Sequence, residues 1–148
     1  MPYEIRSTFI EAVLQCPELA IKFPSNRAEL ESIAKGFCEK ASARIFTRCI
    51  GAIDGFFAPT EKPKIKDVCG NQKAFYSGHY RMYGLNVQAV VNADLKFIYF
   101  GVIGPGSMND SRSFNKSGLY LVLEELPEEF YMVGDTAYPL SQKCLSYL

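Results

Sequence analysis

The sequence is poor in the residues that build zinc sites and disulfide frameworks. It contains one histidine, His79, and five cysteines that include no C-x-x-C pair. A zinc site needs several such ligands at close spacing, and a disulfide framework usually has an even number of cysteines. We therefore expect reduced thiols in an intracellular protein, and we expect His79 to be a loop residue rather than a metal ligand.

The sequence also lacks an excess of either charge and an apolar run long enough to cross a membrane. Lys and Arg number 16, as do Asp and Glu, and the longest apolar run covers residues 97–106. A membrane helix needs about 20 apolar residues. The N-terminus has neither the basic flank nor the apolar core of a signal peptide. We expect no membrane partner, and any contact with nucleic acid must come from a local basic patch.

Two apolar runs that each end in an aspartate stand out in a chain that is otherwise an ordinary globular candidate, with 48% hydrophobic residues. Residues 49–53 lead into Asp54, and residues 130–134 lead into Asp135. Such a run is typical of a buried strand that ends at a working edge of a sheet. If the two strands are parallel neighbours, both carboxylates project from one edge and can share a cation.

Each aspartate also has a purely structural interpretation. Asp54 is followed by Gly55, and this pair is common in tight turns. Asp135 could be the N-cap of a helix that starts near Ala137. The matching position of the two residues at the ends of two strands favours the metal site.

Two helices are expected before the first of these strands. Ile5, Phe9 and Val13 lie at helical spacing, and a second pattern follows Asn26 and Glu29, which resemble a capping box. We expect these helices to cover the sheet. The linker between them is too long for a DNA-reading helix-turn-helix motif, which is the alternative.

The segment between residues 60 and 83 mixes basic and aromatic side chains. Such a mixture can clamp a phosphate backbone and stack on bases, and a solvated loop anchored by tyrosines is an equal alternative. In an extended chain the three alternating lysines would point one way. The candidate nucleic-acid-binding residues are Lys62, Lys64, Lys66, Lys73 and Arg81.

The second half of the chain alternates strand and helix patterns. The expected elements are a hairpin with strands at 83–91 and 96–103, a helix through residue 126, a strand at 130–135 and a helix that begins near Pro139. This order predicts the α/β fold of the ribonuclease H-like class, a mixed sheet with covering helices, because the last strand returns through a helical crossover. We expect a partial domain over residues 45–148, preceded by a helical segment over 1–44.

Four motifs in this order resemble those of the Harbinger-type, transposase-derived nucleases of the D-D-E endonuclease superfamily. The motifs cover residues 53–55, 84–90, 104–112 and 134–140. The resemblance implies a metal-dependent DNA endonuclease of the nucleus, with the cytoplasm as a further location, that uses Mg²⁺ or Mn²⁺. By motif, Asp54 falls on the first family aspartate and Asp135 on the second. Asp110 falls on a recurrent family aspartate and is a candidate further metal ligand.

The sequence departs from the family pattern at several positions. Phe56 and Phe57 stand where family members commonly have threonine and histidine, and Asn109 stands where a histidine is usual. The chain ends at Leu148, before the expected third acidic ligand, so we expect a C-terminally truncated domain that is inactive alone. The alternative is a catalytically inactive, domesticated transposase domain that binds DNA or a protein partner, which would supply DNA targeting.

Overall fold

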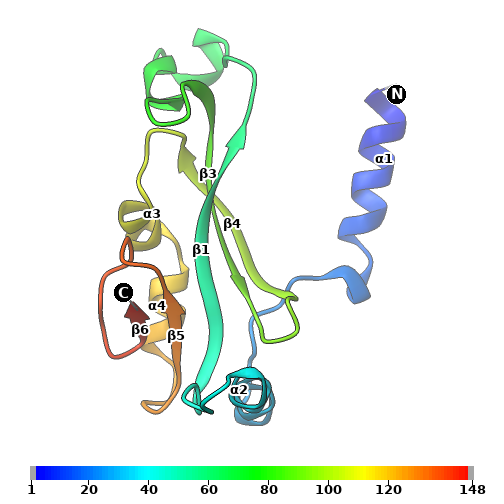
Figure 1. Cartoon of the computed structure of the whole chain (residues 1–148). Coiled ribbons are helices and arrows are strands. Elements are labelled where there is room, and N and C mark those ends of the chain that lie inside the picture. Colours follow the sequence, from blue (N-terminus) through cyan, green and yellow to red (C-terminus); the bar gives the residue numbers. More distant parts are fainter. Residues whose placement is uncertain (1–2, 147–148) are drawn as a thin grey trace.

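The computed structural model describes residues 3–146 as a mixed sheet with helices (Figure 1). The helices are α1 (Tyr3–Leu14), α2 (Arg27–Lys40), α3 (Asp110–Lys116) and α4 (Leu119–Glu124). The strands are β1 (Cys49–Pro59), β2 (Tyr76–Ser77), β3 (Met82–Val91), β4 (Phe97–Pro105), β5 (Tyr131–Gly134) and β6 (Cys144–Ser146). Three short 3-10 helices are η1 (Pro17–Leu19), η2 (Ile65–Val68) and η3 (Gln72–Phe75).

The sheet is built on β1, which lies between an antiparallel and a parallel neighbour. Its strand order is β2-β3-β1-β5-β6, and β4 also pairs with β3. The expected hairpin is β3 with β4, and the expected parallel return is β5 beside β1. This arrangement confirms the ribonuclease H-like α/β fold, because an antiparallel hairpin is followed by a helical crossover to a strand parallel to the first.

Strand β1 is longer than the sequence pattern predicts. It continues through Asp54 and Gly55 to Pro59, and Asp54 pairs with Ala89 while Gly55 pairs with Gln88. The interpretation of Asp54 and Gly55 as a tight turn is therefore wrong. The apolar pattern ends at Asp54 because the strand extends there beyond β5, not because the strand itself stops.

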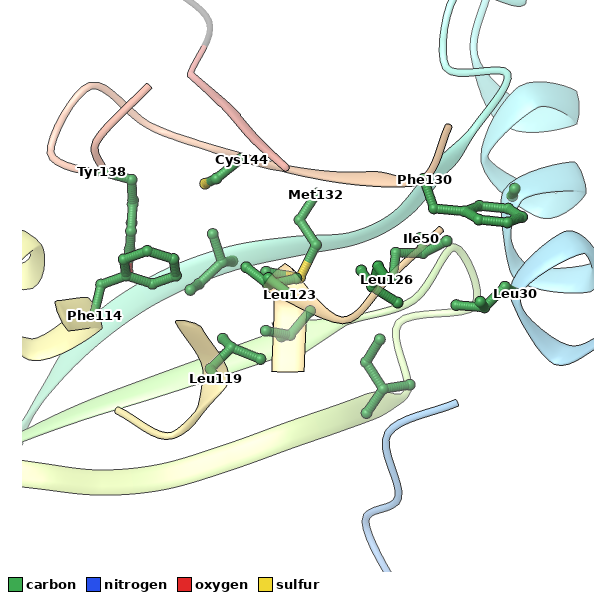
Figure 2. Packing of buried hydrophobic residues seen from close by; sticks show 14 residues of the cluster. Leu30, Ile50, Phe114, Leu119, Leu123, Leu126, Phe130, Met132, Tyr138 and Cys144 are labelled. Atoms are coloured by element: carbon green, nitrogen blue, oxygen red, sulfur yellow. The ribbon is translucent and has the colours of Figure 1, made fainter. Parts of the chain in front are cut away.

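One hydrophobic core joins the sheet to three of the helices (Figure 2). Leu30 comes from α2, Phe114 from α3 and Leu119 from α4, and all three are buried in the same cluster as the strand residues Ile50 and Met132. Each large aliphatic or aromatic side chain buried in this way contributes about 1.5–3 kcal/mol. The core therefore sits between the sheet and helices α2, α3 and α4.

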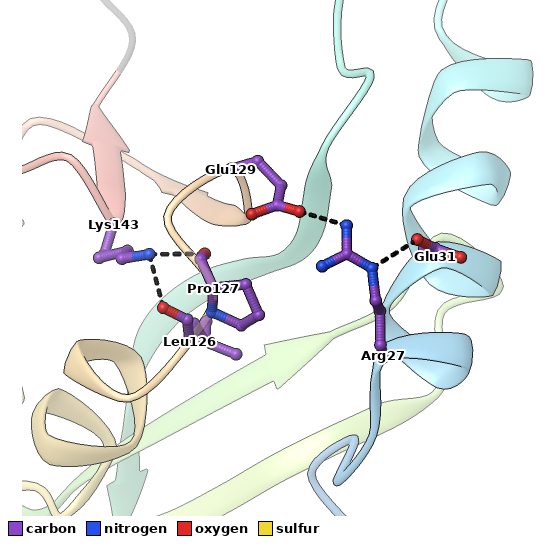
Figure 3. A network of polar contacts seen from close by, with 6 residues as sticks. All are labelled: Arg27, Glu31, Leu126, Pro127, Glu129 and Lys143. Carbon is purple, nitrogen blue, oxygen red and sulfur yellow. Dashed lines mark hydrogen bonds and ion pairs between the residues drawn. The ribbon is translucent and has the colours of Figure 1, made fainter.

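Helix α2 begins at the predicted cap and is tied to the chain that enters β5. Asn26 Oδ1 accepts a hydrogen bond from Glu29 N at 3.0 Å, and Glu29 Oε2 accepts one from Ser25 N at 2.7 Å. Arg27 then forms ion pairs with Glu31 and with Glu129 (Figure 3). The cap satisfies backbone donors that the helix itself leaves unpaired.

A second polar contact in Figure 3 holds the segment after α4. Lys143, just before β6, donates to the carbonyl oxygens of Leu126 at 2.8 Å and Pro127 at 2.6 Å. These carbonyls follow the C-terminal end of α4, where a cation is favoured. The contact fixes the turn between α4 and β5 to the start of β6.

Helix α1 forms as predicted but does not cover the sheet. In Figure 1 it stands away from the strands, and Phe9 and Leu14 are 67% and 78% exposed. Its apolar spacing therefore predicted the helix correctly and its burial wrongly. Helix α2, in contrast, supplies Leu30 and Ala34 to the core. The predicted domain boundary at residue 44 stays a prediction.

Two expectations for the C-terminal half need correction. The helix predicted through residue 126 is divided into α3 and α4, with Ser117 and Gly118 between them. No helix follows Pro139 in the described residues; the chain forms β6 instead, parallel to β5. Leu140 is 71% exposed while Cys144 is buried, so the apolar residues there belong to a loop and a strand rather than to a helical stripe.

Within residues 3–146, no helix is both long and apolar enough to cross a membrane. All five cysteines carry free thiols. Cys49 and Cys144 are buried in the strands, whereas Cys69 is exposed. Burial raises the pKa of the Cys49 thiol from 9.0 to about 11, so this thiol stays protonated and unreactive at neutral pH.

Candidate functional site

Asp54 and Asp135 lie at the same level of the sheet, where β5 ends beside β1. The parallel register pairs Ala52 of β1 with Val133 of β5, and each aspartate lies two residues beyond its member of that pair. Both residues are exposed. The parallel pairing therefore brings the two predicted metal ligands together at one edge, as the sequence pattern led us to expect.

The hydrogen bonds of these two carboxylates are local. Asp54 Oδ1 accepts from Gly55 N at 2.8 Å, and Asp135 Oδ1 accepts from Ala137 N at 3.0 Å. Together with the backbone hydrogen bond from Tyr138 N to Asp135 O, the second bond closes a turn. No helix starts at this turn in the described residues, so Asp135 is not a helix cap. Among the described residues neither carboxylate forms an ion pair, which leaves carboxylate oxygens available to a cation.

Asp110 is the first residue of α3 and is held by two amide side chains of β3. Its Oδ1 accepts from Asn86 Nδ2 at 3.1 Å and from Gln88 Nε2 at 2.9 Å. The cap of α3 is the neighbouring Asn109, whose side chain accepts from Arg112 N at 2.9 Å. Asp110 is therefore held in place by hydrogen bonds from β3, while its neighbour Asn109 caps the helix.

Gln88 connects Asp110 to the loop after β5. It is fully buried, and its Oε1 accepts a hydrogen bond from the Tyr138 hydroxyl at 2.6 Å. Its Nε2 also donates to Asn86 Oδ1 at 3.0 Å. Every polar atom of the buried Gln88 side chain thus has a partner, as burial of a polar group requires.

Tyr138 lies near all three aspartates. Burial raises the pKa of its phenol, and the negative charges of Asp110, Asp54 and Asp135 raise it further. A charge raises the pKa of an acid in this way only when it is close. The phenol therefore stays neutral and donates its hydrogen bond over the whole physiological pH range.

Gly55 allows Asp110 to approach β1. A Cβ atom at this position would collide with Asp110 Oδ1 and would lie 2.6 Å from Gln88 Nε2. Glycine therefore follows Asp54 because the carboxylate of another segment occupies the space of a side chain. A conformational requirement for a turn does not explain it, since Gly55 lies within a strand.

The pair of aspartates suits a hard divalent cation, but the described residues do not form a complete set of ligands. Exposed carboxylate oxygens are what Mg²⁺ and Mn²⁺ prefer, and Mg²⁺ commonly keeps several waters. Within residues 3–146 no group of three or more His, Cys, Asp or Glu side chains is placed to hold a metal ion. Asp110 is bonded to its amide partners and does not complete such a group.

The predicted basic residues lie on the segment that leads from β1 to β3, at the end of the sheet far from α2 (Figure 1). Lys62, Lys64, Lys66, Lys73 and Arg81 are all exposed. The chain is extended only as far as Lys64, because Lys66 lies in η2, so the three lysines do not continue one alternating pattern. Lys62 Nζ lies 5.8 Å from the centre of the Tyr83 ring.

Sequence reasoning missed the inner residues of this site. Asn86 and Gln88 alternate with apolar residues in β3, which is the pattern of a solvent-facing side, yet both are buried. The sequence signal for these two residues was that β3 carries two amide side chains in the motif at 84–90, which precedes the motif that contains Asp110. Tyr138 gave no signal of its own beyond its place in the motif after Asp135.

Comparisons with known proteins agree with this geometry. Residues 53–148 match the family described as DDE superfamily endonuclease. The chain is also similar to "Protein ALP1-like" of Arabidopsis thaliana, with 29% identity over 153 aligned positions. That alignment covers 93% of this chain and 35% of the relative, so the chain spans about a third of the length of the curated relative it matches. No solved structure gives a significant match.

Proposed function

Because the chain belongs to the DDE superfamily endonucleases, we propose that it carries residues of a metal-dependent nuclease site that cleaves phosphodiester bonds in DNA. The resemblance to the Harbinger-type, transposase-derived nucleases is confirmed by the same match and by the ALP1-like relative. Family membership implies contact with nucleic acid. The metal, the site residues and the location in the cell are parts of the proposal.

The observation that carries the proposal is the shared register of Asp54 and Asp135. Both lie two residues past the Ala52 and Val133 pair, so they lie at the same level, where β5 has ended and β1 continues. Two exposed carboxylates at one strand edge repel each other, and a bound cation would remove that repulsion. A purely structural role would not need two such charges at one edge.

In this proposal Asp54 and Asp135 hold Mg²⁺ or Mn²⁺, and Asp110 is a candidate further ligand. When bound, a divalent cation of this kind polarises a phosphate and lowers the pKa of water. Asp54 is positioned by its pairing with Ala89 of β3, two residues after β1 is last paired with β5, which restricts where its carboxylate can point. Tyr138 holds Gln88, and Gln88 holds Asp110, so the surroundings of the pair are rigid.

The exposed basic segment would contact the DNA backbone. Lys62, Lys64, Lys66, Lys73 and Arg81 supply positive charge that a chain with no net charge does not have overall. DNA as substrate makes the nucleus the proposed location, with the cytoplasm as a second one. A protein partner would supply DNA targeting.

A second candidate function is a binding module without catalysis. It is favoured by the fact that within residues 3–146 no group of three or more His, Cys, Asp or Glu side chains is placed to hold a metal ion. Such a domain would bind DNA or a protein partner and would not cleave. In the nuclease proposal, a third carboxylate must join Asp54 and Asp135, so we expect residues 1–148 alone to bind metal weakly and to nick supercoiled DNA poorly.

Metal binding by the two aspartates is the direct test. We expect Mn²⁺ titration, followed by water-proton relaxation, to show weak binding that Asp54→Asn and Asp135→Asn each abolish. Asp67→Asn is the matched control, because Asp67 is an exposed aspartate of η2, outside the site. Binding that survives in both site variants would exclude the proposed metal site.

A nicking assay on the longest natural chain then separates the two functions. The nuclease proposal predicts Mg²⁺- or Mn²⁺-dependent nicking of supercoiled plasmid that Asp135→Asn removes. DNA binding without nicking, at equal affinity in the wild type and in Asp135→Asn, would favour the binding module.

A further inference from the structure

A cavity of about 440 Å³ opens beside Asp110, and its lining includes neither Asp54 nor Asp135. It lies between β1, the turn that joins β2 to β3, and the segment before α3. The residues that matter in its lining are Phe56, Phe57, His79, Tyr80, Asn86 and Asp110. Gly55, the residue after Asp54, also lines it, so the cavity borders the strand that carries the proposed metal ligand.

The walls of this cavity are aromatic and partly exposed. Phe57 and Tyr80 stack with ring centres 4.6 Å apart, and His79 meets Tyr80 edge-on at 4.7 Å. Tyr80 is 52% exposed, so part of its ring faces the solvent. The ring of Phe56 packs instead near Phe100 of β4, with ring centres 6.0 Å apart. Aromatic rings arranged in this way are surfaces on which a flat group can stack.

The cavity also has a hydrogen-bond acceptor in its wall. Asp110 Oδ1 takes both amide hydrogen bonds, from Asn86 and from Gln88. Asp110 Oδ2 makes no hydrogen bond with the residues that the structure describes and is left as an acceptor. A carboxylate in such a place selects ligands that present an amino group.

A second hollow adjoins the first one. It is lined by Lys73 and Asn71, among others, and it shares Gly78 and Ser107 with the aromatic cavity. Lys73 therefore lines a hollow that borders the aromatic cavity. An aromatic cavity with an acceptor, next to a hollow with a cation, matches a nucleobase next to its phosphate.

We propose that the aromatic cavity binds one unpaired nucleobase of a DNA strand, and that Asp110 favours bases with an exocyclic amino group. The inference rests on the proposed action on DNA and adds to it how the strand is held. A base inside a duplex cannot reach the cavity, so the nucleotide must be unstacked or already unpaired. Stacking supplies most of the affinity, and the carboxylate accepts from the N4 amino group of cytosine.

Fluorescence anisotropy with labelled duplexes tests this inference in EDTA, so that metal binding plays no part. The probes are a fully paired duplex, the same duplex with one bulged cytosine, and one with a bulged thymine. We expect the cytosine bulge to bind about tenfold more tightly than the paired duplex, the effect of one stacked base. The thymine bulge should bind with an intermediate affinity.

The variants separate stacking from recognition of the amino group. Tyr80→Ala should remove the preference for bulged DNA, and Tyr80→Phe should keep it. Tyr120→Ala is the matched control, because Tyr120 is a 42% exposed aromatic residue of α4 that does not line the cavity. Asp110→Asn should abolish the preference for cytosine over thymine, since the carboxylate acceptor becomes an amide.

The outcomes distinguish this inference from the function it rests on. Equal affinity for bulged and paired duplexes, in the wild type and in Tyr80→Ala, overturns the base site and leaves DNA binding intact. Failure to bind any duplex at low salt overturns both. Free dCMP is the last arm: competition at micromolar concentration would mean a mononucleotide site and would overturn the role in holding a DNA strand.

Discussion

Gly55 shows how closely single residues of this site depend on one another. Its missing side chain leaves room for Asp110, whose carboxylate is bonded to Asn86 and Gln88, and Gln88 is bonded in turn to Tyr138. Three segments of the chain thus meet in one hydrogen-bonded group, and Gly55 of β1 packs against it. The geometry around Asp54 depends on this group as well as on the sheet.

We expect Gly55→Ala to destabilise the protein by about 1–3 kcal/mol, the usual cost of forcing extra atoms into a packed site. The new methyl group would displace Asp110 and press on Gln88 Nε2. Urea unfolding measures the loss. Gly118→Ala is the control, because a Cβ there meets no atom within 4 Å, so its free energy of unfolding should not fall. A loss of equal size in both variants would contradict the packing argument.

The Tyr138→Phe variant should be less stable by about 1–3 kcal/mol at pH 7, because it leaves the buried Gln88 Oε1 without a donor. It should also change the pH dependence of stability. Burial and the three aspartates raise the pKa of Tyr138 above its ordinary value of 10.0. The folded state therefore favours the neutral phenol, and this contribution is complete below pH 10 and declines as the pH rises further.

The measurement is urea unfolding between pH 8 and pH 11. The wild type should lose stability more steeply above pH 10 than Tyr138→Phe does. The buried Cys49 thiol, whose pKa is also raised, adds a decline that begins near pH 9 and is common to both proteins. Tyr120→Phe, an exposed tyrosine, should follow the wild type; parallel curves for all three proteins would contradict the assignment.

At the scale of elements, the sequence predicts those parts that depend on local pattern. The sequence alone predicted the cap at Asn26 and the hairpin β3–β4 from apolar spacing and local motifs. It also predicted that Asp54 and Asp135 follow two neighbouring parallel strands. The helix expected after Pro139 was wrong, because Cys144 and Leu145 pair with β5, and such pairing is not visible in a short window. Gln88 and Tyr138 were missed since only the fold brings them together.

The basic segment between β1 and β3 is the element whose role is easiest to isolate. If Lys62, Lys64 and Lys66 contact phosphates, their replacement by glutamine should flatten the log–log salt dependence of DNA affinity by about two to three units. The reason is that each contact releases condensed counterions from the DNA. Anisotropy titrations between low and physiological salt give the slope.

A charge-matched triple variant controls for the change in net charge. Lys22, Lys35 and Lys116 are exposed lysines outside the basic segment, and their replacement by glutamine should leave the slope unchanged. An equal change in both triple variants would mean that the protein's overall charge, and not this segment, sets the affinity. The segment would then be a solvated loop.

On the scale of the whole molecule, the chain divides into a packed body and a separate helix. Leu30 and Ala34 of α2 belong to the core, whereas the apolar side chains Ile5, Phe9 and Leu14 of α1 are exposed. Stability comes from area removed from water, so α1 contributes little to it. The body that carries the site should therefore be stable without α1.

Deletion of residues 1–20 should change the free energy of unfolding by no more than about 0.5 kcal/mol, the range of surface changes. Leu30→Ala should in contrast cost about 2–5 kcal/mol, because Leu30 is 4% exposed in the core. Urea unfolding of both proteins checks the pair. A large loss on deletion would show that α1 packs on the body in solution.

The parallel pairing of β1 with β5 also determines when the site comes together during folding. Cys49 and Tyr131, at the start of that pairing, are about 80 positions apart in the chain, whereas β3 and β4 are joined by a short turn. Because closing a longer loop costs more entropy, the hairpin can form early and the β1–β5 contact only late. Asp54 and Asp135 meet in that late step, so we expect the two carboxylates to come together only when β5 joins the sheet.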